Sequence, residues 1–137
     1  MQNLSPLAGY STTPLIKKLG IQESIKVMLV NAPQDYMKLL EFDICNQLVN
    51  KFSEADLVHV FISSKEELKK QFSRIIKEAK SNLIIWISWY KKSSGISTDV
   101  TEDVIREVVL PTGWVDVKVC AVSEVWSGLK IVRRKNE

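Results

Sequence analysis

The stretch LVHVFISSKEELKKQFSRIIKEA, residues 57–79, decides the fold class because it joins a buried strand directly to an amphipathic helix. Its first eight residues, Leu57 to Ser64, are mostly apolar and β-branched, which is typical of a strand covered on both faces. Ser64 and Glu67 then have the S-x-x-E spacing of a capping box, which predicts that a helix begins there. The apolar side chains that follow share one helix face: Leu68, Phe72, Ile75, Ile76 and Ala79.

Similar strand and helix signals precede and follow this unit. IKVMLVN (residues 25–31) and LIIWISW (residues 83–89) predict two more buried strands, and we expect the first to lie centrally in the sheet. Thr13 before Pro14 predicts the start of a short helix, PLIKKL, that ends at Gly20.

A further helix should follow the strand at residues 83–89. Asp99 and Glu102 have capping-box spacing before a run of valines and Ile105, and Pro111 predicts its end. Residues 35–50 are ambiguous: YMKLLEF suits a helix, and DICNQLV suits either a strand or more helix. We expect a helix followed by a strand.

The C-terminal part predicts a hairpin. VDVKVCAV (residues 115–122) alternates apolar with polar residues, as exposed or edge strands do. The turn SEVWSG (residues 123–128) then returns the chain into LKIVRR. Strands that alternate with helices predict one α/β domain over residues 1–137. We therefore expect a three-layer, doubly wound, mostly parallel, Rossmann-like sheet that ends in an antiparallel β-hairpin.

Composition excludes several classes of protein. The chain has 137 residues, of which 45% are hydrophobic and 26% are charged, as in a globular domain. A net charge of +3, with lysines interleaved among glutamates, gives no reason to expect a nucleic-acid partner. Without a signal-like or 18-residue apolar segment, we expect a soluble cytoplasmic protein that does not bind membranes. Cys45 and Cys120 are interpreted as buried, reduced thiols.

Common catalytic and cofactor motifs are missing. The five glycines cannot form a G-x-G-x-x-G or P-loop motif after the strand at residues 25–31. The sequence has no C-x-x-C or H-x-x-x-H spacing for zinc and no G-x-S-x-G elbow. The single histidine, His59, lies in an apolar strand and is interpreted as structurally satisfied. Neither a metal nor a specific cofactor is indicated.

Polar residues cluster where the predicted strands end. Ligands of open α/β sheets bind outside the carboxyl ends of the strands. There, hydroxyl groups, lysines and helix amides could surround an anion, and Gly95 permits a tight loop. The candidate ligand-binding residues are Asn31, Ser63, Lys91, Lys92, Ser93, Ser94, Gly95, Thr98 and Trp126. The alternative is that WYKKSSG (residues 89–95) is a solvated loop before a capped helix.

Long motifs carry a family resemblance. They are AGYSTTPLIKKLGI (residues 8–21), VNAP (residues 30–33), SWYKKSSGISTDVTEDVIREV (residues 88–108) and VDVKVCAVSEVWSGLKIVRR (residues 115–134). With these motifs the chain resembles the bacterial domain of unknown function 3052 family, which implies no activity. The element order also resembles a shortened class I methyltransferase, which implies S-adenosylmethionine binding after the first strand. The glycine-rich loop of that group is replaced here by residues 31–35.

These observations favour a noncatalytic or regulatory module that binds an anionic small molecule or an acidic peptide at the carboxyl ends of its strands. Two alternatives stay open. One is a diverged S-adenosylmethionine-dependent methyltransferase. The other is an interaction or structural protein that pairs its edge strand, residues 115–122, with a partner or with a second copy in a homo-oligomer.

Overall fold

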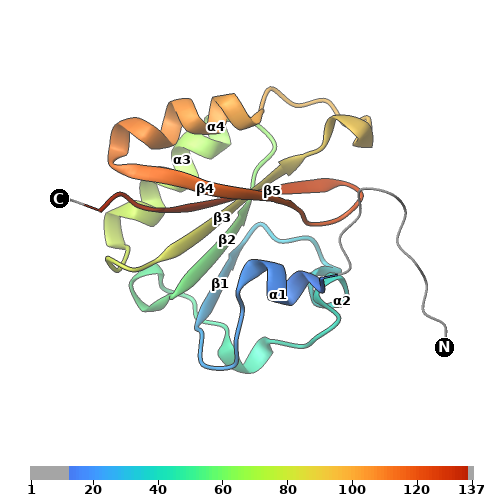
Figure 1. Cartoon of the computed structure of the whole chain (residues 1–137), viewed down its shortest axis with the longest axis vertical. Helices are drawn as coiled ribbons and strands as arrows, with labels where there is room; N and C mark the ends of the chain where they lie inside the picture. Colours follow the sequence, from blue (N-terminus) through green and yellow to red (C-terminus); the bar gives the residue numbers. More distant parts are fainter. Residues whose placement is uncertain (1–12, 136–137) are drawn as a thin grey trace.

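A computed structural model describes residues 13–135 of the chain, which form a five-stranded sheet with helices on both faces (Figure 1). The helices are α1 (Leu15–Leu19), α2 (Tyr36–Leu40), α3 (Lys65–Glu78) and α4 (Glu102–Val109). The strands are β1 (Val27–Val30), β2 (Leu57–Phe61), β3 (Ile84–Tyr90), β4 (Trp114–Ala121) and β5 (Trp126–Arg133). Short 3₁₀ turns lie at Cys45–Gln47, Phe52–Glu54, Lys92–Ser94 and Leu110–Thr112. No helix within residues 13–135 is long and apolar enough to cross a membrane.

The sheet is mixed, with strand order β1-β2-β3-β5-β4. β1, β2 and β3 pair in parallel, whereas β5 is antiparallel to both β3 and β4. The expectation of a mostly parallel sheet is therefore wrong, because the terminal hairpin inserts β5 between β3 and β4. The predicted edge strand is confirmed as β4. The strand predicted to be central is β1, which lies at the opposite edge.

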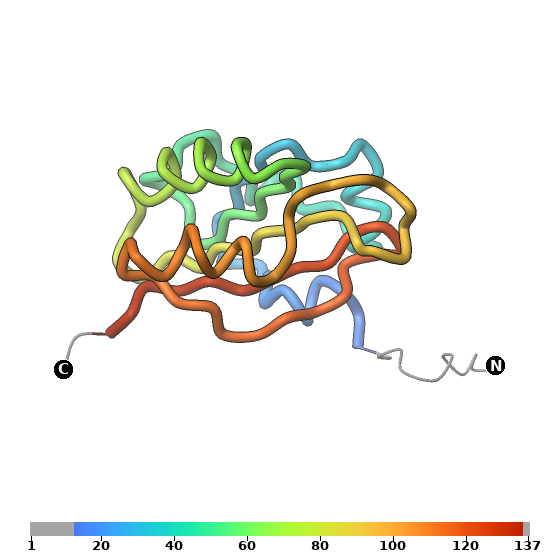
Figure 2. The backbone as a smooth tube through the Cα atoms, turned by 90° about the horizontal axis from the view of Figure 1, so that it is seen from above, coloured from blue at the N-terminus to red at the C-terminus, as the bar shows by residue number. Residues whose placement is uncertain are grey.

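Two apolar cores lie on the two faces of the sheet. Figure 1 shows α3 and α4 on one side of the sheet and α1 and α2 on the other, and Figure 2 shows the same backbone from above. α3 and α4 pack on one face through Leu68, Phe72 and Ile105, against alternate residues of β2 and β3. α1 and α2 pack on the other face, where Leu19 and Leu40 meet the remaining residues of those strands. All five residues of β2 are buried, as its continuous apolar sequence predicts.

The ambiguous segment before β2 contains the predicted helix but not the predicted strand. α2 takes the helical part, and the later residues form 3₁₀ turns. Leu48 makes one parallel bridge with Val27, and the Val49 N–H donates to the Val27 carbonyl at 2.9 Å. The chain therefore passes along the outer edge of β1 without a full strand, and the isolated bridge marks where a strand was expected.

The helix caps follow the sequence at α3 but not at α4. The Ser64 side chain accepts a hydrogen bond from the Glu67 N–H, as predicted. α4 is capped by Thr101, which accepts from the Val104 N–H. The prediction that Asp99 caps α4 is wrong, because its carboxylate instead accepts from the Lys65 N–H at the start of α3. Asp99 therefore ties the loop before α4 to the first turn of α3.

Candidate functional site

The first candidate site lies at the carboxyl ends of β1 and β2, and this position is called the crevice below because ligands of open α/β sheets bind there. After β1 the chain forms α2 on one face, passes the outer edge at Leu48 and crosses to the other face at Phe52. After β2 it forms α3 on that second face. The connections from neighbouring parallel strands thus leave on opposite faces, which is the condition for a ligand crevice at the carboxyl ends of strands.

Asn31, Ser63 and Glu67 meet at this crevice. The Asn31 side-chain amide donates to Glu67 Oε2 at 3.2 Å. The Ser63 N–H and hydroxyl donate to Glu67 Oε1 at 2.8 and 3.2 Å. The Thr98 hydroxyl donates to the Ser63 carbonyl at 2.7 Å. Three predicted site residues are therefore joined, directly or through Ser63, to one carboxylate that sequence reasoning had interpreted only as a helix cap.

Asn31 gives the loop after β1 a sharp turn. Its φ of 57° lies in the left-handed region, where glycine is favoured and asparagine is tolerated better than most residues. Asn31 therefore takes the backbone conformation that a glycine would supply, while it adds a polar side chain to the crevice. Pro33, two residues later, has no N–H to offer a ligand.

The segment WYKKSSG (residues 89–95), called the lysine loop below, holds a second group of predicted site residues on the α1 side of the sheet. The Lys91 N–H donates to the Val125 carbonyl at 2.8 Å, so the loop and the β4–β5 turn lie together, as expected. Trp126 belongs to β5 rather than to the turn, and its ring stacks on Tyr90 with centroids 4.3 Å apart. It also meets Phe61 edge-on at 4.9 Å.

The rest of the loop builds its own turn. The Ser94 hydroxyl donates to the Lys91 carbonyl at 2.7 Å and accepts from the Ile96 N–H at 3.1 Å. Gly95 adopts a left-handed φ of 76°, which is the tight path expected of it. Lys92 and Ser93 are exposed. The nine predicted residues therefore divide between the crevice and this loop instead of forming one site.

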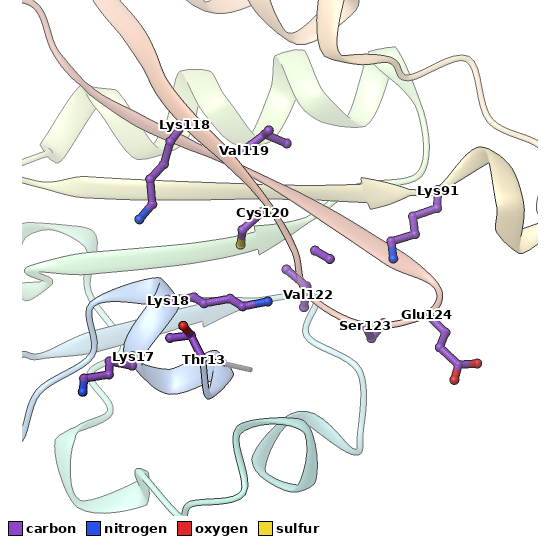
Figure 3. A pocket seen from close by; sticks show the side chains of 11 residues that line it. Thr13, Lys17, Lys18, Lys91, Lys118, Val119, Cys120, Val122, Ser123 and Glu124 are labelled. Atoms are coloured by element: carbon purple, nitrogen blue, oxygen red, sulfur yellow. The ribbon is translucent and has the colours of Figure 1, made fainter. Parts of the chain in front are cut away.

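A pocket of about 690 Å³ lies between α1 and β4 (Figure 3). Four lysines line it: Lys17, Lys18, Lys91 and Lys118. Glu124 and Cys120 also line it. Sequence reasoning found only Lys91, because the others come from a short helix and from an alternating edge strand whose lysines look like ordinary surface residues.

A buried polar chain runs beneath this face. Tyr36 Oη lies 2.8 Å from His59 Nδ1, and His59 Nε2 lies 2.7 Å from Ser88 Oγ. All three residues are buried. Burial lowers the pKa of His59 from 6.5 to about 3, and burial raises the pKa of Tyr36 above its ordinary value. The interpretation of His59 as a satisfied structural residue agrees with these contacts.

The two cysteines differ from the prediction. Both are free thiols, but Cys45 is exposed and Cys120 is only partly buried. Within residues 13–135, no group of three histidine, cysteine or acidic side chains is placed to hold a metal ion.

Comparisons with known proteins place the fold. No family model and no curated protein matches the chain. A protein of the NADB-Rossmann superfamily from Streptococcus agalactiae aligns with a TM-score of 0.60 at 8% identity, over 96% of this chain and 73% of that one. The B. subtilis M1A22 tRNA methyltransferase TrmK aligns with 0.59 at 8% identity, over 93% and 68%. A ribosomal protein L11 methylase from Lactobacillus delbrueckii subsp. bulgaricus aligns with 0.53 at 13% identity, over 88% and 76%.

The chain therefore has the Rossmann-like fold of these methyltransferases, as its element order had suggested. The same comparisons correct the expectation of a noncatalytic binding module. The solved structures that share this arrangement include a tRNA methyltransferase and a ribosomal protein methylase.

Proposed function

We propose that this protein is a diverged S-adenosylmethionine-dependent methyltransferase whose cofactor binds in the crevice between the ends of β1 and β2. The observation that carries the proposal is a polar cluster at a particular place in the fold. The connections after β1 and β2 leave on opposite faces, and Asn31 and Ser63 are both hydrogen-bonded to Glu67 there. The named activities of structural neighbours, on a tRNA and on a ribosomal protein, support the reaction class but differ in substrate.

The residues at the crevice suit the polar groups of the cofactor. S-adenosylmethionine carries ribose hydroxyls and an ammonium group, which are hydrogen-bond donors, and Rossmann-type sites commonly use an acidic side chain as the acceptor for ribose hydroxyls. Glu67 supplies a carboxylate, and Asn31 and Ser63 supply an amide and a hydroxyl beside it. When bound, the cofactor would supply an electrophilic methyl group.

The loop after β1 departs from the usual glycine-rich form. Side chains and Pro33 prevent the close backbone approach that glycines allow. We therefore propose that side chains, rather than backbone N–H groups, bind the cofactor, with Glu67 as the main contact. The relation to the domain of unknown function 3052 family rests on the sequence motifs alone, since no family model matches the chain, and it is therefore also a proposal.

Isothermal titration calorimetry with S-adenosylmethionine tests the proposal. Glu67→Gln keeps the shape of the side chain but removes its charge, and a charge-assisted hydrogen bond contributes about 1.5–3 kcal/mol. The affinity should therefore fall by roughly tenfold or more. Glu66→Gln is the matched control, because Glu66 is an exposed residue of the same helix turn. The absence of binding at millimolar cofactor, or equal affinities for both variants, would contradict the proposal.

A further inference from the structure

We infer that the pocket between α1 and β4 recognises the phosphate group of a small molecule. The first observation is the grouping of positive charge. Lys17 and Lys18 come from α1, Lys91 follows β3, and Lys118 belongs to β4, so three separate parts of the chain place lysines around one pocket. The side chains of Lys18 and Lys91 extend toward each other (Figure 3). Glu124 is the acidic residue among those that line it.

The second observation is that these ammonium groups form no ion pair in the part of the chain that the structure describes. Within residues 13–135, Lys17, Lys18, Lys91 and Lys118 take part in no salt bridge, unlike Lys65 and Lys80. Ammonium groups of like charge around one cavity repel each other, and an anion bound among them relieves that repulsion. A surface lysine gains no such benefit when it is isolated and solvated. The arrangement therefore favours an anion with more than one negative charge.

The shape of the site indicates the size of the ligand. A volume of about 690 Å³ lies within the range of about 300–1,000 Å³ that holds small organic ligands, so the pocket admits more than an inorganic ion. Val122 and Cys120 add apolar lining beside the lysines. A small molecule that carries a phosphate group and a less polar remainder would complement both the lysines and the apolar side chains of the pocket.

The position of the pocket suggests which molecule this is. Lys91 follows β3, and Asn31 and Ser63 follow β1 and β2. The pocket therefore extends to the carboxyl ends of the parallel strands, where the crevice also lies. Trp126 comes directly after the β4–β5 turn, whose residues Ser123 and Glu124 line the pocket, and it contacts Phe61 in β2. We therefore identify the phosphorylated molecule as the methyl-accepting substrate, and this identification rests on the proposed function.

Pyrophosphate is the probe for the pocket, measured by calorimetry on the full chain without divalent metal. The double variant Lys18→Ala plus Lys118→Ala should weaken pyrophosphate binding at least tenfold. Lys69→Ala plus Lys70→Ala is the control with the same loss of charge, because both residues are exposed on α3, on the opposite face of the sheet. Equal affinities for the two double variants, or no binding by the natural chain at millimolar pyrophosphate, would overturn the inference.

Cys120 reports where the probe binds. In a Cys45→Ser background Cys120 is the single thiol, so its alkylation rate can be measured directly. Burial raises the pKa of Cys120, and the charges of Lys18 and Lys118 partly offset that rise. A bound anion would offset those charges and cover the thiol, so pyrophosphate should slow alkylation severalfold. An unchanged rate at saturating pyrophosphate would place the probe elsewhere and overturn the inference.

S-adenosylmethionine titrated into the same lysine variants separates the two proposals. Its affinity should be unchanged in Lys18→Ala plus Lys118→Ala, because Glu67 lies outside the pocket. If the natural chain binds pyrophosphate through these lysines but does not bind S-adenosylmethionine, the phosphate site stands and the proposed function fails. If it binds S-adenosylmethionine alone, the proposed function stands and this inference fails.

Discussion

At the scale of single residues, the buried chain from Tyr36 through His59 to Ser88 shows what a sequence can and cannot predict. His59 lies in an apolar strand, so its burial could be anticipated, and so could its need for hydrogen-bond partners. Ser88 could be placed on the next strand. Tyr36 could not be identified as a partner, because residues 35–50 left helix and strand both open and the packing of α2 decides the contact.

The first prediction concerns the pH dependence of stability. Burial lowers the pKa of His59 to about 3, so below its ordinary value of 6.5 the unfolded chain binds a proton that the folded chain does not. The contribution of His59 is therefore complete above about pH 6.5 and is lost as the pH falls toward 3, by about 1.4 kcal/mol per unit. Urea unfolding at pH 4–7 should show a shallower dependence for His59→Gln. Parallel curves for the two proteins would show that His59 does not titrate in this way.

Gly128 is a second residue with a specific prediction. It lies in β5, and an added Cβ would stand 3.0 Å from Val122 Cγ2 and 3.4 Å from Trp86. Gly128→Ala should destabilise the protein by roughly 1–3 kcal/mol through overpacking. The neighbouring Ser127→Ala should change stability by less than about 0.5 kcal/mol. Thermal unfolding of the two variants compares them, and equal midpoints would argue against tight packing at this position.

At the scale of elements, the sequence predicts helices and strands where the local chemistry is strong. Ser64 and Glu67 mark the start of α3, and continuous apolar runs mark β2 and β3. The sequence favours Asp99 over Thr101 as the cap of α4, because Glu102 follows Asp99 at capping-box spacing whereas Val104 occupies that position after Thr101. Only the packing of the loop against α3 shows that Asp99 bonds to Lys65.

The α4 cap gives the third prediction. Thr101→Ala removes the acceptor for the Val104 N–H and should cost about 1 kcal/mol of stability. Ser97→Ala is the control, since Ser97 is an exposed loop residue four positions earlier. Chemical denaturation measures both variants. If Ser97→Ala costs as much as Thr101→Ala, the assigned cap is wrong.

At the scale of the whole molecule, the alternation of strands and helices predicts an α/β sandwich, but not its strand order. The place of β5 between β3 and β4 depends on how the hairpin packs, which no local pattern records. The candidate sites likewise depend on contacts between elements that are far apart in the sequence. The predicted residues that follow individual strands divide between the crevice and the loop after β3, and the lysine pocket combines α1 with β4, which only the folded chain brings together.

The measurement that tests the central claim most directly is a ¹H–¹⁵N NMR titration of the natural chain with S-adenosylmethionine. Saturable shifts are expected in the amides of residues 31, 32, 34 and 35 and of residues 63–67, around Asn31 and Glu67. Amides of the exposed face of α3, such as Lys70, should not move. No shifts at millimolar cofactor, or shifts confined to parts of the chain outside the crevice, would contradict the assignment of a methyltransferase cofactor site to this fold.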